Sequence, residues 1–333
     1  MTTQKLNVLI IGCGNIAGGF DAERPVDALP FTHTSAYLQH GGFTLAGCID
    51  PDEARRTAFC ERWAISNDSA CIETLPLVEG GVDVVSICSP TDFHREHLEV
   101  VLQLNPKIIF CEKPISTCFS DSLHCIQLCE AKGVLLAINY TRRWAPDIVR
   151  LHNDIVSGKW GEIRSVVAHY NKGILNNGGH VLDLLHYLLG ALSLKSVGKP
   201  IWDFWEKDPT ISAVLHSQTG VPIYLNTADA RDYALFEIQL VTEHGVIAIE
   251  SGGLVWRIRR AIDSPTFKGY RALDSGEIIE GEYCFAMTNA IKNLYDAICG
   301  DVPLASTGNS AIVTQQLCEE IRGAAMENIS LDN

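Results

Sequence analysis

Short runs of apolar residues alternate with segments of helical periodicity over the first part of the chain. The runs are nearly continuous in Val, Ile and Leu, as in the strands of a parallel sheet that is covered on both faces. Repeated strand–helix–strand units of this size predict a doubly wound sheet. The predicted strands are Leu6–Ile11, Phe43–Ile49, Val82–Cys88, Lys107–Cys111 and Val134–Ile138, and the predicted helices are Asp52–Ala64, Asp92–Leu104 and Ser120–Lys132.

The pattern changes after Asn139. Closely spaced strand-like stretches between Ser193 and Glu280 meet at glycine-containing turns, which indicates a mainly antiparallel sheet. We therefore predict an α/β chain with two domains, a doubly wound parallel sheet in residues 1–119 and a second α/β domain in residues 120–333. The other elements predicted after Asn139 are helix Pro146–Val156, strand Ile163–Tyr170, and helices Val181–Leu189, Ala286–Ile298 and Ser310–Met326.

Composition and charge narrow the class of protein. The chain of 333 residues is 47% hydrophobic and 20% charged, which excludes a disordered or fibrous protein. Its formal charge of −14 would repel a polyanion, so we expect no nucleic-acid partner. No apolar run approaches the roughly 20 residues of a membrane helix, and Thr2–Gln4 do not begin a signal peptide. We expect a soluble, cytoplasmic protein with no membrane partner.

The twelve cysteines favour reduced thiols over disulfides. Cys13, Cys48, Cys88 and Cys111 lie in or beside apolar runs, where a free cysteine behaves as a small hydrophobic residue. The chain has no Cys-x-x-Cys pair and no histidine at zinc-finger spacing from a cysteine. Reduced core thiols fit a cytosolic protein, and we expect no metal site.

The first candidate site is the turn Gly12-Cys13-Gly14-Asn15-Ile16-Ala17, which directly follows the first strand. In Gly-x-Gly-x-x-Ala, the first glycine permits a tight turn, and the second lets a diphosphate approach the backbone. Ala17 keeps the following helix close to the strand, and the N–H groups at the start of that helix would bind phosphate. We therefore expect Gly12, Gly14, Asn15 and Ile16 to bind a dinucleotide. The alternative is a structural turn with no nucleotide.

Asp50, at the end of the second strand, strengthens this prediction because its carboxylate can accept both ribose hydroxyls. It lies farther from Gly14 than the roughly 20 residues that are usual. We interpret the proline-interrupted stretch Phe20–Phe31 as an insertion. A carboxylate repels the 2′-phosphate of NADP, so NAD is the expected cofactor. NADP stays possible because Arg55 and Arg56 follow closely; the alternative for both arginines is a solvated helix face.

Further polar residues follow the strands predicted at Val82–Cys88 and Lys107–Cys111. These are Ser89-Pro90-Thr91-Asp92-Phe93-His94 and Glu112-Lys113-Pro114. Both segments lie at the carboxyl ends of parallel strands, the edge where open α/β sheets bind ligands. Pro114 restrains the turn and should orient Lys113 toward a substrate. Taken alone, Lys113 could equally be a surface lysine in a salt bridge.

Together, these motifs resemble those of the Gfo/Idh/MocA family of NAD(P)-dependent sugar and polyol dehydrogenases. The resemblance rests on the glycine turn, Ser-Pro-Thr-x-x-His ending at His94, Glu-Lys-Pro, Asn139-Tyr140-x-Arg142 and Gly158-x-x-Gly161-Glu162-Ile163, in that order. It implies a Rossmann domain followed by an α/β domain with an open sheet whose face often packs against another subunit. It also implies that Lys113 lies by the hydroxyl that is oxidised. On this basis we expect the cofactor to contact Ser89, Thr91, His94 and Glu112.

The family motif Asp-x-x-x-His-x-x-Asp corresponds here to residues 176–183, with Asn176 in place of the first Asp. Because an amide orients a hydroxyl but cannot exchange a proton at neutral pH, acid/base work would fall to His180 or Lys113. We favour His180, whose unperturbed pKa of about 6.5 suits reversible proton transfer. The alternative is a core histidine. Asp183 would bind His180 or a substrate hydroxyl, or only pack, and we expect His186 to be structural.

Further candidates for substrate binding are Tyr140, Arg142 and Lys172, with Arg143 in the same polar cluster as the first two. Such cations would be needed by an anionic substrate such as a nucleotide sugar or a uronic acid. Trp256, Ile258 and Arg260 alternate on one face of a predicted strand, a face that would either invite a partner subunit or be buried within the chain. We expect a homo-oligomer, a dimer or a tetramer.

Three functions remain open. The leading prediction is an NAD(P)-dependent oxidoreductase that transfers a hydride between nicotinamide and a carbinol or keto carbon of a sugar, nucleotide sugar or polyol. A non-catalytic dinucleotide-binding regulator is the alternative for which Asn176 argues most strongly. The third is a redox-neutral eliminase in which the cofactor is reduced and reoxidised within one cycle. Lys113 and His180 together favour the oxidoreductase.

Overall fold

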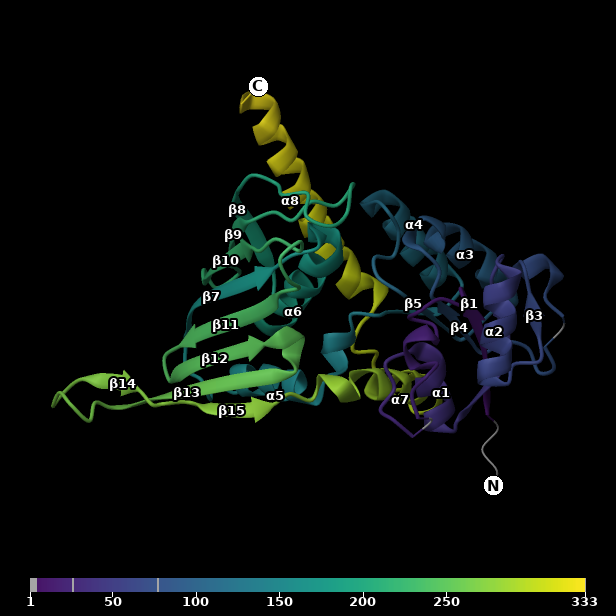
Figure 1. Ribbon diagram of the computed structural model, residues 1–333, viewed down its shortest axis with the longest axis horizontal. Helices are drawn as coiled ribbons and strands as arrows, with labels where there is room; N and C mark the ends of the chain where they lie inside the picture. Colours follow the sequence, from purple (N-terminus) through teal and green to yellow (C-terminus); the bar gives the residue numbers. More distant parts are fainter. Residues whose placement is uncertain (1–4, 26, 77, 333) are drawn as a thin grey trace. The chain divides into compact units, whose positions relative to one another are not determined.

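The computed structural model describes residues 5–332 apart from residues 26 and 77. The chain divides into two compact units, each built around its own sheet (Figure 1). Unit 1 comprises Met1–Trp144 and Cys284–Ile312, and unit 2 comprises Ala145–Tyr283 and Val313–Asn333. The described part of the chain contains no helix that is both long and apolar enough to cross a membrane.

Unit 1 contains a six-stranded sheet in the order β3-β2-β1-β4-β5-β6, with every neighbouring pair parallel. The predicted doubly wound sheet is confirmed, and β1 and β2 have the predicted bounds. The two-residue strand β3 was not predicted, since so short a segment carries no periodicity. The strands are β1 (Leu6–Ile11), β2 (Phe43–Ile49), β3 (Asp68–Ser69), β4 (Val84–Ile87), β5 (Ile108–Cys111) and β6 (Leu135–Ile138).

Helices cover both faces of this sheet, which explains why its strands are apolar on both sides. One core contains side chains of α1 (His33–His40), α2 (Glu53–Trp63) and α7 (Ala286–Cys299). The other contains side chains of α3 (His94–Val101) and α4 (Phe119–Ala131). Because helices cover both faces of this sheet, a binding site can form only at its edges or at the ends of its strands.

The turn after β1 differs from the prediction, because no regular helix follows it directly. After Gly14 the chain makes one turn and then enters the predicted insertion. Beyond the insertion, the backbone nitrogens of His33 and Thr34 donate to the carbonyl oxygens of Ile16 and Ala17. Through these two hydrogen bonds, the start of helix α1 is joined to the end of the turn after β1, although the inserted segment separates them in sequence. The insertion is anchored by the buried Asp21, whose carboxylate accepts hydrogen bonds from four donors: Arg24 Nη1, Phe31 N, Thr32 N and Thr32 Oγ1.

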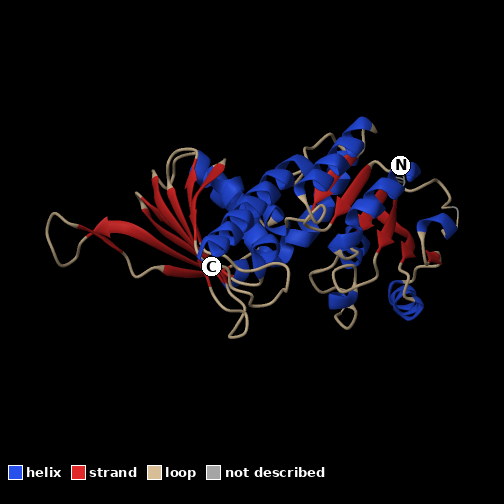
Figure 2. Ribbon diagram, turned by 90° about the horizontal axis from the view of Figure 1, so that it is seen from above, coloured by secondary structure: helices blue, strands red, loops and turns tan. Residues whose placement is uncertain are grey.

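Unit 2 contains a mixed, mostly antiparallel sheet of nine strands in the order β14-β13-β12-β11-β7-β10-β9-β8, with β15 paired to β13. Only β7 and β10 run parallel. Figure 2 shows the strands as a twisted fan with helices to one side. The strands are β7 (Ile163–Tyr170), β8 (Leu192–Val197), β9 (Ala213–Ser217), β10 (Pro222–Thr227), β11 (Phe236–Thr242), β12 (Gly245–Glu250), β13 (Val255–Asp263), β14 (Arg271–Leu273) and β15 (Glu277–Glu280). The helices are α5 (Pro146–Val156), α6 (Gly179–Leu189) and α8 (Gly308–Asp332). The first residues of α8 belong to unit 1.

Burial alternates along β7, β9, β11 and β12, so one face of this sheet is buried and the other is half-exposed. The α/β class with a mainly antiparallel second sheet is confirmed. The division between the units differs from the predicted boundary at residue 119. Unit 1 extends to Trp144 because β6 pairs with β5, and Cys284–Ile312 returns to it because α7 packs against its sheet.

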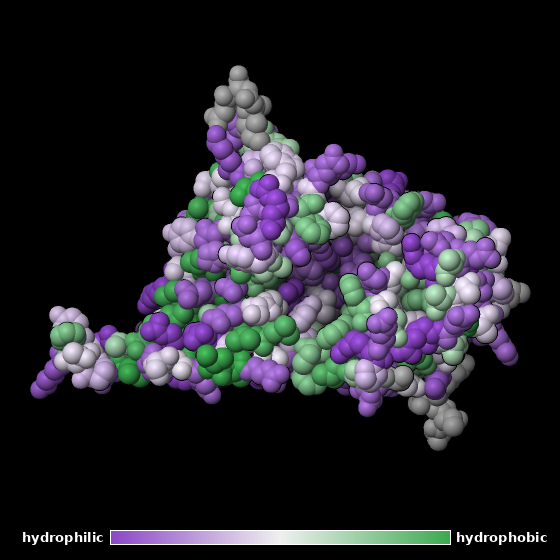
Figure 3. Space-filling view, in the orientation of Figure 1, coloured by the Kyte–Doolittle hydropathy of each residue, from purple (hydrophilic) through white to green (hydrophobic). Residues whose placement is uncertain are grey.

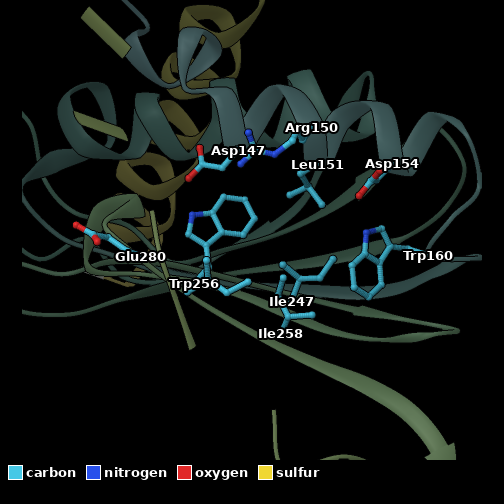
Figure 4. A pocket seen from close by; sticks show the side chains of 10 residues that line it. Asp147, Arg150, Leu151, Asp154, Trp160, Ile247, Trp256, Ile258 and Glu280 are labelled. Atoms are coloured by element: carbon cyan, nitrogen blue, oxygen red, sulfur yellow. The ribbon is translucent and has the colours of Figure 1, made fainter. Parts of the chain in front are cut away.

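The face of β13 that carries Trp256 and Ile258 is covered within the chain. Both side chains point toward α5 and line a cavity of about 150 Å³ beneath Asp147 and Leu151 (Figure 4). Trp256 is only 6% exposed. Of the two possibilities that the sequence left open for this face, burial within the chain is therefore the one that holds for Trp256, whereas Ile258 is half-buried.

Candidate functional site

The carboxyl ends of the central strands of unit 1 surround a cavity of about 390 Å³. Gly12 follows β1 with a φ of +86°, a conformation that favours glycine. A Cβ at Gly12 would lie 2.7 Å from the backbone nitrogen of Ser89, so the turns after β1 and β4 pack directly on this glycine. A Cβ at Gly14 would meet no atom within 4 Å. The first glycine joins two turns, and the second leaves open space beside its own turn.

Asp50 lies at the end of β2, beside this turn, and is only 3% exposed. Its Oδ2 accepts a hydrogen bond from the backbone nitrogen of Cys13 at 2.8 Å, and its Oδ1 accepts one from that of Asp52 at 2.9 Å. These two bonds fix the carboxylate at the wall of the cavity. Arg55 also lines the cavity, with Nη1 3.4 Å from Asp50 Oδ2. Arg56 instead pairs with Asp68, so only Arg55 is placed to meet a ligand.

The segment after β4 contributes Ser89 to the cavity wall. Its hydroxyl lies 2.9 Å from Nδ1 of His97, which also lines the cavity and which the sequence analysis missed. Thr91 begins a short 3₁₀ turn and does not line the cavity. His94 is 1% exposed, and its two ring nitrogens each lie 2.8 Å from a carbonyl oxygen, of Pro114 and of Ser89. The ring of His94 therefore lies between two turns, and its predicted contact with the cofactor stays a prediction.

A buried hydrogen-bonded network lies behind the end of β5. Glu112 Oε1 accepts from His33 Nε2 at 3.0 Å and from Asn139 Nδ2 at 2.6 Å. Nδ1 of His33 lies 3.2 Å from the hydroxyl of Ser86, which is 2.9 Å from that of Tyr37. One arrangement of protons satisfies these contacts: Tyr37 donates to Ser86, Ser86 to His33, and His33 to Glu112. The network joins α1 to the ends of three neighbouring strands.

This network controls the charge next to Lys113. Burial raises the pKa of Glu112, but the hydrogen bonds from His33 and Asn139 outweigh it and hold the pKa below its ordinary value. Glu112 is therefore a carboxylate at neutral pH, directly before the half-buried Lys113. The Lys113–Pro114 peptide bond is cis. Glu112 was predicted to contact a cofactor, and in the structure its carboxylate accepts hydrogen bonds from His33 and Asn139.

Of the other predicted residues of unit 1, Asn15 is exposed and Ile16 half-buried in the turn after β1, and the rest lie in the segment after β6. Asn139, which anchors Glu112, is followed by Tyr140, which is 3% exposed. Arg142 is half-buried in a 3₁₀ turn. Arg143 is buried, with Nη1 3.4 Å from the carbonyl oxygen of Ala305. Arg143 therefore has a structural contact, and Arg142 is the more accessible of the two arginines.

In unit 2, a π-helical turn over Gly173–Gly178 leads into α6. Lys172 precedes this turn in the left-handed conformation, with a φ of +65°. Asn176 lies within it, and its backbone nitrogen donates to Oδ2 of Asp208 at 2.9 Å. His180 is the second residue of α6 and is half-buried. The turn and the helix thus bring Lys172, Asn176 and His180 into one short segment.

Asp183 lies one turn further along α6 and is 1% exposed. The hydroxyl of Thr314 on α8 is 3.5 Å from its Oδ1. This burial favours a positioning role for Asp183 over direct contact with a substrate. His186, which was expected to be structural, lines a separate small cavity with residues of α8.

Gly12, Asp50 and Ser89 were predicted from the sequence, and they line one cavity. The sequence analysis missed His33, Ser86 and Tyr37, because a buried polar network leaves no periodic signal. It also missed Asp203 and Asp208, which anchor the residues around Lys172 and Asn176. Their signal was weak, because Asp203 and Asp208 lie in an irregular loop far along the chain from the residues they bind.

The cavity of unit 1 fits a dinucleotide. Open space beside Gly14 admits a diphosphate against the backbone, and Asp50 presents a carboxylate at the cavity wall. The cavity continues between Arg55, Ser89 and His97, with a volume suited to an adenosine group. Gly12, Gly14, Asp50 and Ser89 are the residues that would hold the cofactor.

The first part of the chain is similar to a known protein family. Residues 6–140 match the GFO_IDH_MocA family model, described as "Oxidoreductase family, NAD-binding Rossmann fold". The first 140 residues are therefore similar to the NAD-binding Rossmann domain of the Gfo/Idh/MocA family. The predicted resemblance is therefore confirmed, as is a dinucleotide cofactor of the NAD type.

Relatives extend the match beyond unit 1. The chain is 24% identical to inositol 2-dehydrogenase of Rhizobium meliloti over 281 residues, which cover 77% of this chain and 83% of the relative. It is 26% identical to D-glucoside 3-dehydrogenase of Escherichia coli over 66% of this chain and 67% of the relative. The structure of the WlbA dehydrogenase from Bordetella pertussis, in complex with NADH and UDP-GlcNAcA, is similar in fold, with a TM-score of 0.76, 18% identity and 98% of both chains covered.

Proposed function

We propose that this protein is an NAD(P)-dependent dehydrogenase or ketoreductase that acts on a carbinol or keto carbon of a sugar, nucleotide sugar or polyol. The single observation that carries the proposal is the cavity lined by Gly12 and Asp50, at the sheet edge where the Glu112-Lys113-Pro114 turn also begins. The similarity of residues 6–140 to an oxidoreductase family supports it. So do the names of relatives that are dehydrogenases of inositol and of D-glucosides.

The protein's own residues would orient the substrate and manage its proton. The nicotinamide, when bound, supplies the hydride chemistry. Lys113, as an ammonium group, donates a hydrogen bond to the reacting oxygen and stabilises the negative charge that develops there. His180 accepts the hydroxyl proton during oxidation and returns it during reduction. Asn176, Lys172 and Arg142 hold other hydroxyl or acidic groups of the substrate.

NAD is the proposed cofactor in preference to NADP. The carboxylate of Asp50 is fixed at the cavity wall by the backbone of Cys13 and Asp52, so it cannot turn away from a 2′-phosphate. Arg55, which is 53% exposed in its side chain, would have to leave Asp50 to neutralise such a phosphate. We expect the Kd for NADP to exceed that for NAD by about tenfold or more, measured by calorimetry.

We also propose a cytoplasmic homo-oligomer. No disulfide joins cysteines of the described residues, even though the sulfur atoms of Cys48 and Cys60 lie 3.4 Å apart. Figure 3 shows hydrophobic residues gathered over β13 and β15. Leu254, Ile278 and Ile279, on or beside these strands, are exposed. Such a patch beside a half-exposed sheet face suits contact with a second copy of the chain.

The proposed oligomer can be tested by introducing a charged residue into this apolar patch. Ile278→Glu should shift the protein toward monomers in sedimentation velocity, since a buried unpaired carboxylate disfavours association. Val156→Glu, at another exposed apolar position, is the matched control and should leave the assembly unchanged. A wild-type protein that sediments as a monomer contradicts the proposal.

One observation favours a non-catalytic regulator as the second candidate, namely Asn176 in place of the family's Asp. The deciding experiment mixes the protein and NAD or NADP with a panel of sugars, polyols and nucleotide sugars and follows nicotinamide absorbance. A dehydrogenase reduces the cofactor with at least one of them. Binding of NAD without turnover of any compound favours the regulator, and a product without net reduction of cofactor reveals the redox-neutral eliminase.

A further inference from the structure

Exposed aromatic side chains gather on two loops of unit 2. Trp202, Phe204 and Trp205 lie in the loop between β8 and β9 and are 46%, 54% and 48% exposed. Tyr233, in the loop between β10 and β11, is 63% exposed. Single exposed aromatic residues are ordinary, but several on loops that share one anchor are not. We call Trp202, Phe204, Trp205 and Tyr233 the aromatic cluster.

The anchor is the segment that carries the proposed substrate residues. Oδ2 of Asp203 accepts from the backbone nitrogen of Lys172 at 3.0 Å and from that of Ala230 at 3.1 Å. The backbone nitrogens of Leu175 and Asn176 donate to the two carboxylate oxygens of Asp208, each at 2.9 Å. The loop of the aromatic cluster is thus held to the π-helical turn by charged hydrogen bonds, which are stronger than neutral ones.

The second loop is held to the same segment. Nδ2 of Asn171 donates to the carbonyl oxygen of Tyr233 at 2.5 Å, and Oδ1 of Asn171 accepts from the backbone nitrogen of Leu235 at 3.1 Å. Asn171 is fully buried and directly precedes Lys172. Both loops therefore take their position from residues 171–176, so the aromatic cluster lies beside the proposed substrate residues of unit 2.

One member of the aromatic cluster touches a proposed substrate residue directly. The ammonium nitrogen of Lys172 lies 5.1 Å from the centre of the Phe204 ring, within range of a cation–π contact. Trp205 packs edge-on against Phe204, with ring centres 4.8 Å apart and planes at 77°. A T-shaped pair leaves a face of an aromatic ring open, and about half of Trp205 is exposed. A half-exposed indole beside the Phe204 ring that Lys172 contacts is suited to a flat, uncharged ring that also carries hydroxyl groups.

Charge argues against a nucleotide in this place. The same loops carry five carboxylates, of Asp203, Glu206, Asp208, Asp229 and Asp232, against three cations, Lys199, Lys207 and Arg231. Arg231 is paired with Asp229, so it does not offset the other acidic groups. A diphosphate would meet this acidic surface in a chain whose formal charge is already −14.

We propose that the aromatic cluster binds a second, uncharged ring of the substrate, so that the protein acts on glycosides in preference to free monosaccharides or nucleotide sugars. The proposal rests on the proposed function, because the first ring would be the one that is oxidised. The second ring, a sugar or an aryl group in glycosidic linkage, stacks on Trp205 and Trp202. The ammonium of Lys172 donates to an oxygen of the substrate near the linkage.

The test compares D-glucose, cellobiose, phenyl β-D-glucoside and UDP-glucose, with the corresponding galactose compounds, as substrates with NAD. We expect kcat/KM for the better glycoside to exceed that for its monosaccharide by about tenfold, the gain that one stacked ring supplies. In the double variant Trp202→Ala/Trp205→Ala this ratio should fall to about one. Phe204 is retained, so the contact with Lys172 is preserved. Phe267→Ala, in the exposed loop between β13 and β14, is the matched control and should keep the wild-type ratio.

A second measurement is the Kd of phenyl β-D-glucoside and of D-glucose for the NAD-saturated protein, by calorimetry. We expect the glucoside to bind about tenfold more tightly than glucose to the wild type, and about equally to the double variant. An unchanged ratio in the double variant overturns the proposal, as does a preference for UDP-glucose. If the double variant dissociates in sedimentation velocity and wild type does not, the cluster is an interface between copies, and the proposal is overturned too. Failure of every sugar to reduce NAD overturns the proposed function instead, whereas turnover without a preference for glycosides overturns only this inference.

Discussion

At the scale of single residues, two glycines in one motif have separable roles. Gly12 has a positive φ and is in contact with the turn after β4, whereas Gly14 borders open space. We predict that Gly12→Ala destabilises the fold by roughly 2–4 kcal/mol, because the methyl group meets rigid backbone in a strained conformation. Gly14→Ala should change the free energy of unfolding by less than about 1 kcal/mol and still weaken NAD binding at least tenfold.

Urea unfolding and NAD calorimetry on both variants check this prediction. Equal loss of stability in the two variants would contradict the assigned roles, and so would wild-type NAD affinity in Gly14→Ala.

The glycine motif and Asp50 could be predicted from sequence. A diphosphate requires glycines directly after the first strand, and the ribose hydroxyls require a carboxylate at the end of the second strand. The role of His94 could not, because a histidine that bonds two backbone carbonyls looks in sequence like any ligand-binding histidine. Its partners, Ser89 and Pro114, are brought to it only by the fold.

At the scale of elements, Glu112 joins the end of β5 to α1 through His33 and to the end of β6 through Asn139. Because the pKa of Glu112 is lower in the folded state than its ordinary value of about 4.5, the carboxylate stabilises the fold. This contribution is present at pH values above about 4.5. It is lost as the pH falls through the lower pKa of the folded state. Gln at this position still accepts both hydrogen bonds but does not titrate. We predict that Glu112→Gln lowers the free energy of unfolding at pH 7 by about 1 kcal/mol.

Below about pH 4.5, the gap between wild type and Glu112→Gln should narrow, because only the wild type loses a charge there. Urea unfolding at several pH values between 3 and 7 gives the two curves. Curves that stay parallel over the whole range would show that Glu112 does not supply the acid-sensitive contribution.

Among the elements, long periodic segments were predictable and irregular ones were not. The prolines revealed the insertion Phe20–Phe31, but the continuation of the turn by α1 depends on hydrogen bonds from His33 and Thr34 across the insertion. The loop with Asp203 and Asp208 has no period, and its role follows only from the backbone nitrogens it binds in a distant segment.

At the scale of the whole molecule, the sequence order of elements gave the class but not the division into units. Cys284–Ile312 lies almost at the end of the chain and yet belongs to unit 1, because apolar residues of α7 complete the core under its sheet. Apolar periodicity marks α7 as a helix but does not say which of two sheets it covers.

The central claim is that Lys113 and His180 serve one hydride transfer. It is tested most directly by the single-turnover rate of nicotinamide reduction in Lys113→Ala, His180→Ala and the double variant, with the sugar that the wild type oxidises fastest. NADH affinity and circular dichroism serve as controls for folding. We predict that each single variant is slower by about 10²–10⁴ and that the double variant is little slower than the worse single one, as for residues that act as a unit. A near-wild-type rate in either single variant, or losses that multiply in the double variant, would contradict the claim.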